Sequence, residues 1–138
     1  MASANLDLAR SIYSSWKRGD FTSTAWADPE IEYVIVDGPA PGNWKGLTAL
    51  EEAGLGVLSA WTDLRVEAEA CRELDKERVV VLTRLSGRGK TSDLELGQMR
   101  AKGLDLLHIR DGKVIRFVLY WDRARAFTDI GIAPETDA

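Results

Sequence analysis

One stretch, Leu107-His108-Ile109-Arg110-Asp111-Gly112-Lys113-Val114, decides the fold of this chain because it predicts a β-hairpin. Asp-Gly between two β-prone runs is a strong hairpin signal, since both residues tolerate the positive φ that a tight turn requires. The hairpin joins an expected strand at 94–109 to an expected last strand at 113–121. These two strands orient the faces of the remaining sheet.

The pairing register follows from keeping the apolar side chains of both strands on one face. A three-residue loop, Arg110-Asp111-Gly112, places Leu107 opposite Ile115 and Asp105 opposite Phe117. A two-residue loop would mix the faces, so we predict the three-residue loop. The shared apolar face then carries Met99, Ala101, Gly103, Asp105, Leu107, Ile109, Ile115, Phe117, Leu119 and Trp121.

Asp105 is the single carboxyl in this apolar face, and its neighbours Gly103 and Ala101 are small enough to leave space beside it. Burial disfavours the charged form of a carboxyl, so we expect a raised pKa for Asp105. Such a group can act as a general base or, when protonated, as a hydrogen-bond donor. The alternative is a structural role, in which Asp105 holds a loop amide or an arginine.

The other elements are predicted from apolar periodicity and from residues that begin and end helices. Helices are expected over 5–18, about 22–27, from Thr48 with a capping box to Glu51, and about 123–130 between an Asp122 N-cap and a Gly131 C-cap. Strands are expected over 31–36, 63–74 and 78–86, with a loop over 37–46 and a turn over 86–90. This order predicts an α+β fold whose largely antiparallel sheet carries helices on one face.

Composition narrows the function classes. The 138 residues fit a single domain, and a net charge of −4 with a pI of about 5.1 gives no global attraction to nucleic acid or to an anionic membrane. One His and one Cys cannot form a Cys/His zinc site, so we expect no metal. We also expect no cofactor. We see no secretory signal and no span-length apolar run, and the lone thiol favours the cytoplasm. Five Trp residues suggest an aromatic interior.

Several short sequence blocks follow one another in a characteristic order over roughly residues 5–132, within a single domain of 1–138. They are Ile12-Tyr13 with Gly19-Asp20, Ala27-Asp28-Pro29-Glu30-Ile31-Glu32-Tyr33, Trp44-Lys45-Gly46, the block Leu107 to Val114, Tyr120-Trp121-Asp122-Arg123 and Ile130-Gly131. This ordered set resembles the nuclear-transport-factor-2-like superfamily, in its SnoaL-like and ketosteroid-isomerase-like branch. The resemblance implies a cone-shaped roll in which a strongly curved sheet wraps helices around a deep cavity. It also implies a homodimer formed through the outer face of the sheet.

The resemblance also implies roles for individual residues. Asp105 looks like the oxyanion-hole aspartic acid of the ketosteroid isomerases, whose general base would fall near Val34 and whose tyrosine would fall near Ile12, beside Tyr13. Asp122 is the nearest match to the acid–base aspartate of SnoaL-like cyclases, although an N-cap role explains it equally well. By likeness to limonene-epoxide hydrolases, Arg84 or Arg100 is a candidate partner of Asp105.

The remaining candidates are carboxyl, aromatic and thiol side chains. Glu32 interrupts an apolar strand, so it is either a second cavity carboxylate or a solvent-facing residue of an edge strand. Tyr13 is a candidate polar partner of Asp105, and Trp44 in its Pro/Gly loop is a candidate lid of the cavity. His108 faces away from Asp105, and Cys71 lies on the charged face of its strand. The expected lining of the cavity consists of Trp16, Trp26, Tyr33, Trp61, Phe117, Leu119 and Trp121.

The sequence therefore predicts a protein that binds a small apolar molecule. If it is an enzyme, we expect cofactor-free acid–base chemistry by Asp105 with Tyr13 or Glu32: isomerisation, cyclisation, dehydration or epoxide hydrolysis. The alternative is a non-catalytic ligand-binding or dimeric assembly module of the same fold. A protein-transport adaptor is the third and weakest reading.

Overall fold

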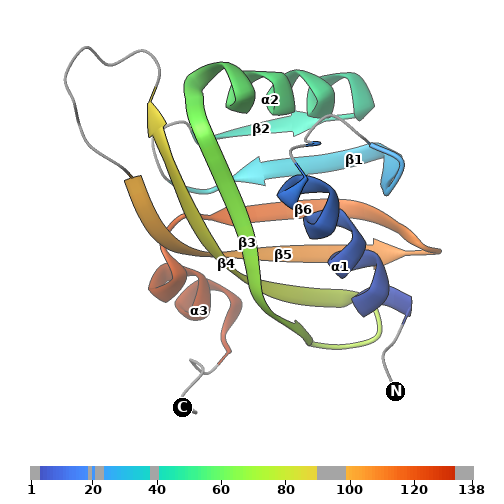
Figure 1. Cartoon of the computed structure of the whole chain (residues 1–138). Helices are drawn as coiled ribbons and strands as arrows, with labels where there is room; N and C mark the ends of the chain where they lie inside the picture. Colours follow the sequence, from blue (N-terminus) through green and yellow to red (C-terminus); the bar gives the residue numbers. More distant parts are fainter. Residues whose placement is uncertain (1–3, 19, 21–23, 38–40, 90–98, 133–138) are drawn as a thin grey trace.

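The computed structural model describes residues 4–18, 20, 24–37, 41–89 and 99–132, with backbone alone at 54–64, 88–89 and 99–101. The strands of the described chain form one curved, open sheet in the order β2-β1-β6-β5-β4-β3 (Figure 1). β1 and β6 are parallel and the other neighbours antiparallel, which confirms the predicted α+β fold with a largely antiparallel sheet. The elements are α1 (Ala4–Lys17), β1 (Ala27–Ile35), β2 (Gly42–Lys45), α2 (Leu47–Ala60), β3 (Trp61–Glu73), β4 (Arg78–Gly89), β5 (Met99–Arg110), β6 (Lys113–Tyr120) and α3 (Arg123–Ile130).

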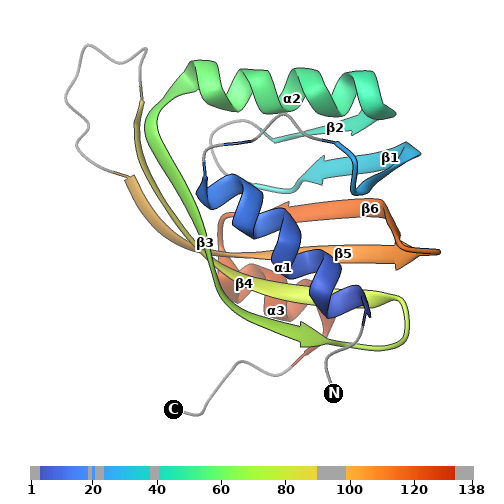
Figure 2. The same ribbon diagram turned by 45° about the vertical axis from the view of Figure 1, so that its right-hand side comes forward.

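The two faces of the sheet bury separate apolar clusters, and Figure 2 shows α1 and α2 on one side of the sheet with α3 on the other. The inner cluster includes Ala9, Ile12, Tyr13, Leu50, Val79, Val81, Leu107 and Phe117. The outer cluster consists of Val80, Leu82, Leu104, Val118, Tyr120 and Ala126. The prediction that all helices cover one face is therefore wrong for α3. β4 is apolar at every position from Val79 to Leu82, and a strand of that kind is buried on both faces.

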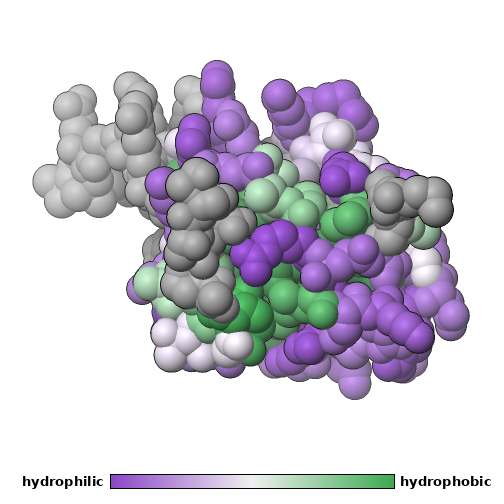
Figure 3. Space-filling model, turned by 90° about the horizontal axis from the view of Figure 1, so that it is seen from below, coloured by the Kyte–Doolittle hydropathy of each residue, from purple (hydrophilic) through white to green (hydrophobic). Residues whose placement is uncertain are grey.

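Several apolar side chains packed against the outer cluster are only partly buried. Figure 3 shows apolar side chains gathered in one patch on the face seen from below, with polar residues beside them. A homodimer through the outer face would have to use the surface that α3 leaves open, and it stays a prediction. The partly buried residues packed on the outer cluster are Val34, Val36, Ala70, Leu74, Leu106, Phe127, Ile130 and Ile132.

The β5–β6 hairpin has a two-residue turn, so the predicted three-residue loop is wrong. Arg110 pairs with Lys113, and the two turn residues between them have φ of 52° and 76°, as a type I′ turn requires. A bulge farther along β6 then shifts the pairing, so that Leu107 lies opposite Phe117 and Asp105 opposite Leu119. The register is displaced by two residues from the predicted one. An even displacement keeps Asp105 and Leu107 on their predicted face. Between the turn and the bulge the displacement is one residue, so Val114 packs in the inner cluster, and the prediction that placed Ile115 there is wrong.

A second bulge, in β3 between Ala68 and Ala70, alters the predicted alternation of that strand. Val66 belongs to the inner cluster, but past the bulge Cys71 packs on the inner cluster and Ala70 on the outer one. The prediction that Cys71 lies on the charged face is therefore wrong. One extra residue in a strand reverses the faces of all later side chains.

Several predicted boundaries change. The short helix predicted at 22–27 is not found over 24–27, where a turn leads into β1, and residues 21–23 lie outside the described part. The predicted loop at 37–46 contains strand β2, and the predicted turn at 86–90 is strand as far as Gly89. Helix α2 starts before Thr48, because the Leu50 amide already donates to the Gly46 carbonyl at 3.0 Å, so the predicted capping box is displaced.

Helix α3 matches its prediction at both ends. The Asp122 side chain accepts hydrogen bonds from the amides of Ala124 and Arg125, and Gly131 ends the helix at φ 80°. Its left-handed conformation suits glycine, which has no side chain to clash. Across the described residues, none of the helices combines the length and apolar character needed to cross a membrane.

Candidate active site

The centre of the candidate site is a hydrogen-bonded pair of buried side chains, Tyr13 from α1 and Asp105 from β5. The Tyr13 hydroxyl donates to Asp105 Oδ2. Tyr13 is 4% exposed and Asp105 is 2% exposed, so both polar groups are removed from solvent. The structure thus joins the two residues that the sequence offered as a carboxyl and its polar partner.

Local sequence explains why these two side chains meet. On α1, Ala9, Ile12 and Tyr13 are buried, because residues three and four apart share one helix face. On β5, the bulged hairpin keeps Asp105 on the face of Leu107. Helix α1 packs its apolar face against the inner face of the sheet, and this contact brings the Tyr13 hydroxyl to the carboxylate.

Burial sets the acidity of this pair. Desolvation raises the pKa of Asp105 to about 7, while the hydrogen bond from Tyr13, which favours the charged carboxylate, lowers it. Burial also raises the pKa of Tyr13, and the nearby charge of Asp105 raises it further. Near pH 7 the Asp105 carboxyl therefore exists in both protonation states, whereas the Tyr13 phenol stays neutral. Asp105 can accordingly accept or release a proton at neutral pH.

A chain of aromatic rings extends from Tyr13 through the interior. The ring centroids are 4.8 Å apart for Tyr13–Trp16, 5.8 Å for Trp16–Phe117 and 5.4 Å for Phe117–Tyr33. Trp26 lies 5.9 Å from Phe117, on the side of Trp16. These spacings are typical of favourable tilted and edge-to-face aromatic contacts. The structure therefore connects four of the predicted lining residues, Trp16, Trp26, Tyr33 and Phe117, to the Tyr13 ring of the polar pair.

Trp44 differs from its prediction. It lies in β2 directly opposite Tyr33, with ring centroids 5.7 Å apart, and packs against the inner cluster. The prediction that Trp44 lies in a loop is therefore wrong, because the predicted loop contains strand β2. Trp44 is partly exposed, so it forms the outer end of the aromatic chain.

The remaining predicted lining residues have different placements. Leu119 and Trp121 are partly buried and pack against the inner cluster, and Leu119 lies directly opposite Asp105. The Trp121 amide donates to the Asp37 carboxylate, which holds the end of β6 beside the end of β1. The side chain of Trp61 lies outside the described residues, so its predicted role stays a prediction.

The structure does not bring Glu32 to Asp105. Glu32 Oε1 lies 3.4 Å from Arg116 Nε, and Glu32 Oε2 accepts a hydrogen bond from Asn43 at 3.2 Å. Its side chain is 40% exposed, as the alternative reading of a solvent-facing carboxylate expected. Its neighbour Tyr33 faces the interior instead, where burial raises the pKa of the phenol.

Three further predicted residues have structural partners. Val34, at the position matched to the isomerase base, packs on the outer cluster. Asp122 caps α3, and Arg84 binds Glu69 at 2.7 Å across β3 and β4. The Arg100 side chain lies outside the described residues. None of the described partners of these residues is Asp105.

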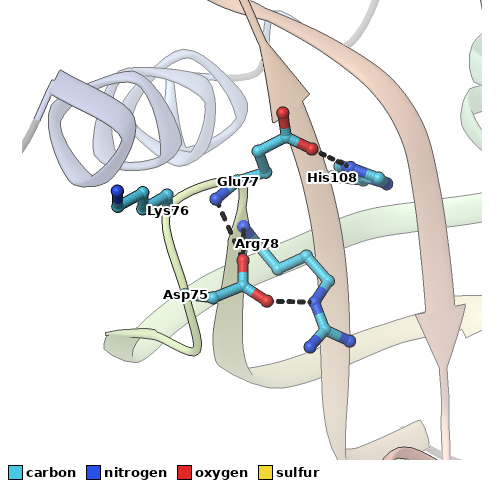
Figure 4. A pocket seen from close by; sticks show the side chains of 5 residues that line it. All are labelled: Asp75, Lys76, Glu77, Arg78 and His108. Carbon is cyan, nitrogen blue, oxygen red and sulfur yellow. Dashed lines mark hydrogen bonds and ion pairs between the residues drawn. The ribbon is translucent and has the colours of Figure 1, made fainter.

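His108 lies on the outer side of β5, as predicted, beside the turn between β3 and β4 (Figure 4). Glu77 points toward His108, with 2.8 Å between Glu77 Oε1 and His108 Nε2, and Asp75 points toward Arg78 at 2.7 Å. These side chains and Lys76 line a surface pocket of about 440 Å³. Both carboxylates of this pocket are paired, Asp75 with Arg78 and Glu77 with His108 and Arg110, so we interpret it as a structural ion-pair cluster.

An open groove of about 520 Å³ leads from the surface to Tyr13. It runs between α1 and β3, and Arg10, Ser14 and Lys17 form its helical wall. Cys71 lies on the strand side, where burial raises the pKa of its thiol. A small molecule in this groove would contact the Tyr13 side of the hydrogen-bonded pair.

Sequence reasoning missed two residues near Asp105. Thr83 is fully buried on β4, and the Arg123 side chain donates to the carbonyls of both Thr83 and Gly103. Gly103 itself does not leave open space, because a Cβ there would lie 2.4 Å from the Tyr120 carbonyl oxygen. A signal for Thr83 existed: it is the polar residue in the row of β4 that otherwise carries Val79, Val81 and Leu85. Arg123 gave no comparable signal.

The described side chains contain no group of three or more His, Cys, Asp or Glu residues arranged to hold a metal ion. The chemistry that the arrangement itself offers is proton transfer by a buried carboxyl beside a neutral phenol.

Comparison with known proteins identifies the fold. No family model matches the sequence, and no curated protein matches it. Among solved structures, a nuclear-transport-factor-2-like protein of unknown function from Burkholderia pseudomallei is 19% identical with a TM-score of 0.76, covering 92% of this chain and 97% of that one. TerC, co-crystallised with polyporic acid, is 20% identical with a TM-score of 0.73 and the same coverage.

A third structure, assigned as a SnoaL-like polyketide cyclase from Jannaschia, is 17% identical with a TM-score of 0.68. It covers 95% of this chain and 94% of its own. The chain therefore has the nuclear-transport-factor-2-like fold, as the sequence resemblance predicted.

Proposed function

We propose that this protein binds a small, largely apolar ketone or related carbonyl compound and catalyses cofactor-free proton transfer on it, with Asp105 as the acid–base residue. The observation that carries this proposal is the buried hydrogen bond from Tyr13 to Asp105 at one end of an aromatic interior. A buried carboxyl costs stability, and perturbed carboxyls of this kind concentrate at functional sites.

The proposed step uses groups of this chain alone. The Asp105 carboxylate takes a proton from the carbon next to the substrate carbonyl, and the electron pair moves onto the carbonyl oxygen to give an enolate. In a β,γ-unsaturated ketone the enolate is a dienolate, and Asp105 can return the proton to its γ-carbon, which shifts the double bond and isomerises the substrate. In a cyclisation the enolate carbon attacks a second carbonyl, and Asp105 gives the proton to the alkoxide oxygen that forms there. The Tyr13 phenol stays neutral and holds the carboxylate in position, because its own pKa is raised.

The structural neighbours support this class of chemistry without assigning a substrate. One neighbour is assigned as a SnoaL-like polyketide cyclase, and TerC was crystallised with polyporic acid. Because one fold hosts many functions, these likenesses do not transfer a reaction to this chain.

The test is hydrogen–deuterium exchange at the α-carbon of 2-tetralone in D2O, followed by NMR. We expect the wild-type protein to accelerate exchange above buffer, and Asp105→Asn to reduce the protein-dependent rate by about 10²- to 10³-fold, as loss of a general base does. Glu77→Gln is the matched control, because it removes a carboxylate from the surface cluster, and it should exchange at the wild-type rate. Equal rates for wild type and Asp105→Asn would contradict the proposal.

A second candidate function is ligand binding without catalysis. It is favoured by one observation: among the described residues, Asp105 is the single fully buried carboxyl, and Glu32 is paired at the surface. This alternative predicts that 2-tetralone binds, measured by calorimetry, while the wild-type protein leaves its exchange rate at the buffer value.

A further inference from the structure

Thr83 presents a hydroxyl that has no partner inside the described structure. The residue is 0% exposed, and its Oγ1 atom has no hydrogen-bond partner among the described atoms. A buried hydroxyl left unpaired costs about 1–3 kcal/mol. Valine has nearly the same shape, and the three residues from Val79 to Val81 show that this strand accommodates valine. A threonine at this position therefore suggests a use for the hydroxyl.

The hydroxyl faces the interior beside Asp105. On β4, Val79, Val81 and Leu85 belong to the inner cluster, and alternation places Thr83 on the same side. Val81 lies directly opposite Asp105 and Thr83 opposite Gly103, so Thr83 and Asp105 are diagonal neighbours on adjacent strands. Diagonal neighbours in an antiparallel pair are about 7–8 Å apart.

Gly103 confirms where the hydroxyl points. A Cβ added to Gly103 would lie 2.9 Å from Thr83 Oγ1, so the hydroxyl lies over the glycine that precedes Asp105 by two residues. No side chain of Gly103 stands between Thr83 and Asp105. The two polar groups thus share one inner-face region.

Arg123 fixes the backbone at this point from the outer side. Its guanidinium donates to the Thr83 carbonyl at 2.8 Å and to the Gly103 carbonyl at 3.0 Å, and it also binds Glu69. One side chain therefore ties the two strands together at the residue pair that carries Thr83 and lies next to Asp105. Such support is what holds a ligand-binding group in a defined position.

We propose that Thr83 is a ligand-binding residue, whose hydroxyl hydrogen-bonds a second oxygen of the molecule whose reacting carbonyl faces Asp105. The ligand class is then a compound with two nearby oxygen functions, such as a 1,3-dicarbonyl or a β-hydroxy ketone. This inference rests on the proposed function, because it takes the Asp105 region to be the ligand site. Thr83 thereby sets specificity, because ligands with the second oxygen bind more tightly than ligands without it.

The test compares two matched probes, benzoylacetone, which has two carbonyls, and butyrophenone, which has one. Affinities are measured by titration calorimetry for wild type, Thr83→Val and Thr83→Ser. We expect wild type to prefer benzoylacetone by about tenfold, as one hydrogen bond of ordinary strength would give. Thr83→Val should lose this preference, and Thr83→Ser, which keeps the hydroxyl, should retain it to within about threefold.

The melting temperature of Thr83→Val gives a second readout. It should rise if the Thr83 hydroxyl is unpaired and fall if the hydroxyl has a structural role. Removing an unpaired hydroxyl without changing shape should make Thr83→Val melt about 3–6 °C above wild type. A lower melting temperature or failure of Thr83→Val to fold would show a structural hydroxyl and overturn the inference. An unchanged probe preference in Thr83→Val, or no preference in wild type, would also overturn it. The proposed function is judged separately, by the 2-tetralone exchange of Asp105→Asn.

Discussion

The interior holds one carboxyl among the described residues, Asp105, and the surface turn between β3 and β4 holds two, Asp75 and Glu77; the fold shifts their acidity in opposite directions. Burial raises the pKa of Asp105, so the folded protein disfavours its charge. At the turn, hydrogen bonds from backbone amides and from Arg78 lower the pKa of Asp75, and bonds from His108 and Arg110 lower that of Glu77. The folded protein favours charge at the turn and resists it in the interior.

This difference separates polar groups that are compatible with folding from polar groups that reduce the stability of the folded state. The carboxyls of the turn are exposed and paired, and pairs of this kind contribute little to stability. Asp105 and Thr83 instead reduce stability where they stand, because one is a desolvated acid and the other an unpaired hydroxyl. Polar groups that cost stability and are held in place by Tyr13 and Arg123 are the ones that indicate a ligand site.

The largest expected effect is the change that Asp105→Asn makes in the pH dependence of stability. The unfolded chain ionises Asp105 near pH 3.8 and the folded chain near pH 7, so ionisation favours unfolding and wild-type stability falls as pH rises between these values. At about 1.4 kcal/mol per pH unit, the stability of wild type relative to Asp105→Asn should fall by about 3 kcal/mol from pH 5 to pH 8.

Urea denaturation of both proteins at pH 5, 6, 7 and 8 measures this difference directly. Contributions from all other carboxyls are common to the two proteins and cancel in the subtraction. A difference that stays constant over this range would show that Asp105 titrates normally, and the interior would then not differ from the surface in the way described above.

The sequence predicted the fold well because the signals were local. The Asp-Gly turn, the α3 caps and the 3.6-residue periodicity of α1 each lie within one element, and each is found in the structure. Two failures involved bulges: the two-residue turn and a bulge in β6 together displaced the register by two residues from the predicted one, and a bulge in β3 turned Cys71 inward. A bulge is set by packing between strands, so the sequence of one strand does not reveal it.

The candidate site was predicted in part for the same reason. Asp105 was visible as a carboxyl in an apolar alternation, and Tyr13 as a polar group on a buried helix stripe. Glu32 carried the same kind of signal but pairs with Arg116, a contact that depends on the parallel pairing of β1 with β6. Thr83 did carry a sequence signal, as a polar residue in an apolar row of β4. Arg123 acts through carbonyls of two neighbouring strands, so its importance emerges only from the assembled sheet.

The intermediate effect is expected at Arg123, whose charged side chain is more buried than those of the turn and less buried than Asp105. Its side chain is 18% exposed and binds two backbone carbonyls as well as Glu69. Arg123→Met keeps much of the apolar stem but leaves those carbonyls unpaired, so we expect a loss of about 2 kcal/mol in the free energy of unfolding.

The matched control is Arg125→Met on the same helix. Arg125 lies 3.5 Å from Asp129 in a pair whose side chains are about half exposed, and its loss should change stability by less than about 0.5 kcal/mol. Urea denaturation at pH 7 measures both variants. Equal effects in the two would show that Arg123 is an ordinary surface arginine and does not hold β4 to β5.

The smallest effect is expected at the turn, and it tests how little an exposed, paired carboxylate contributes to stability. Glu77→Gln removes the carboxylate that binds His108 and Arg110 but leaves an amide oxygen that can still accept a hydrogen bond. A lowered pKa means that the charge of Glu77 favours the folded state at pH values above its unfolded pKa, and that this contribution is lost as pH falls through the folded pKa.

Because the Glu77 side chain is exposed, salt screens this contribution. We therefore expect no measurable change in melting temperature at 0.15 M salt and pH 7, and a small decrease at 0.01 M salt. A large decrease at 0.15 M salt would mean that this cluster stabilises the β3–β4 turn as strongly as Arg123 stabilises the sheet, and exposure would then not distinguish the two regions.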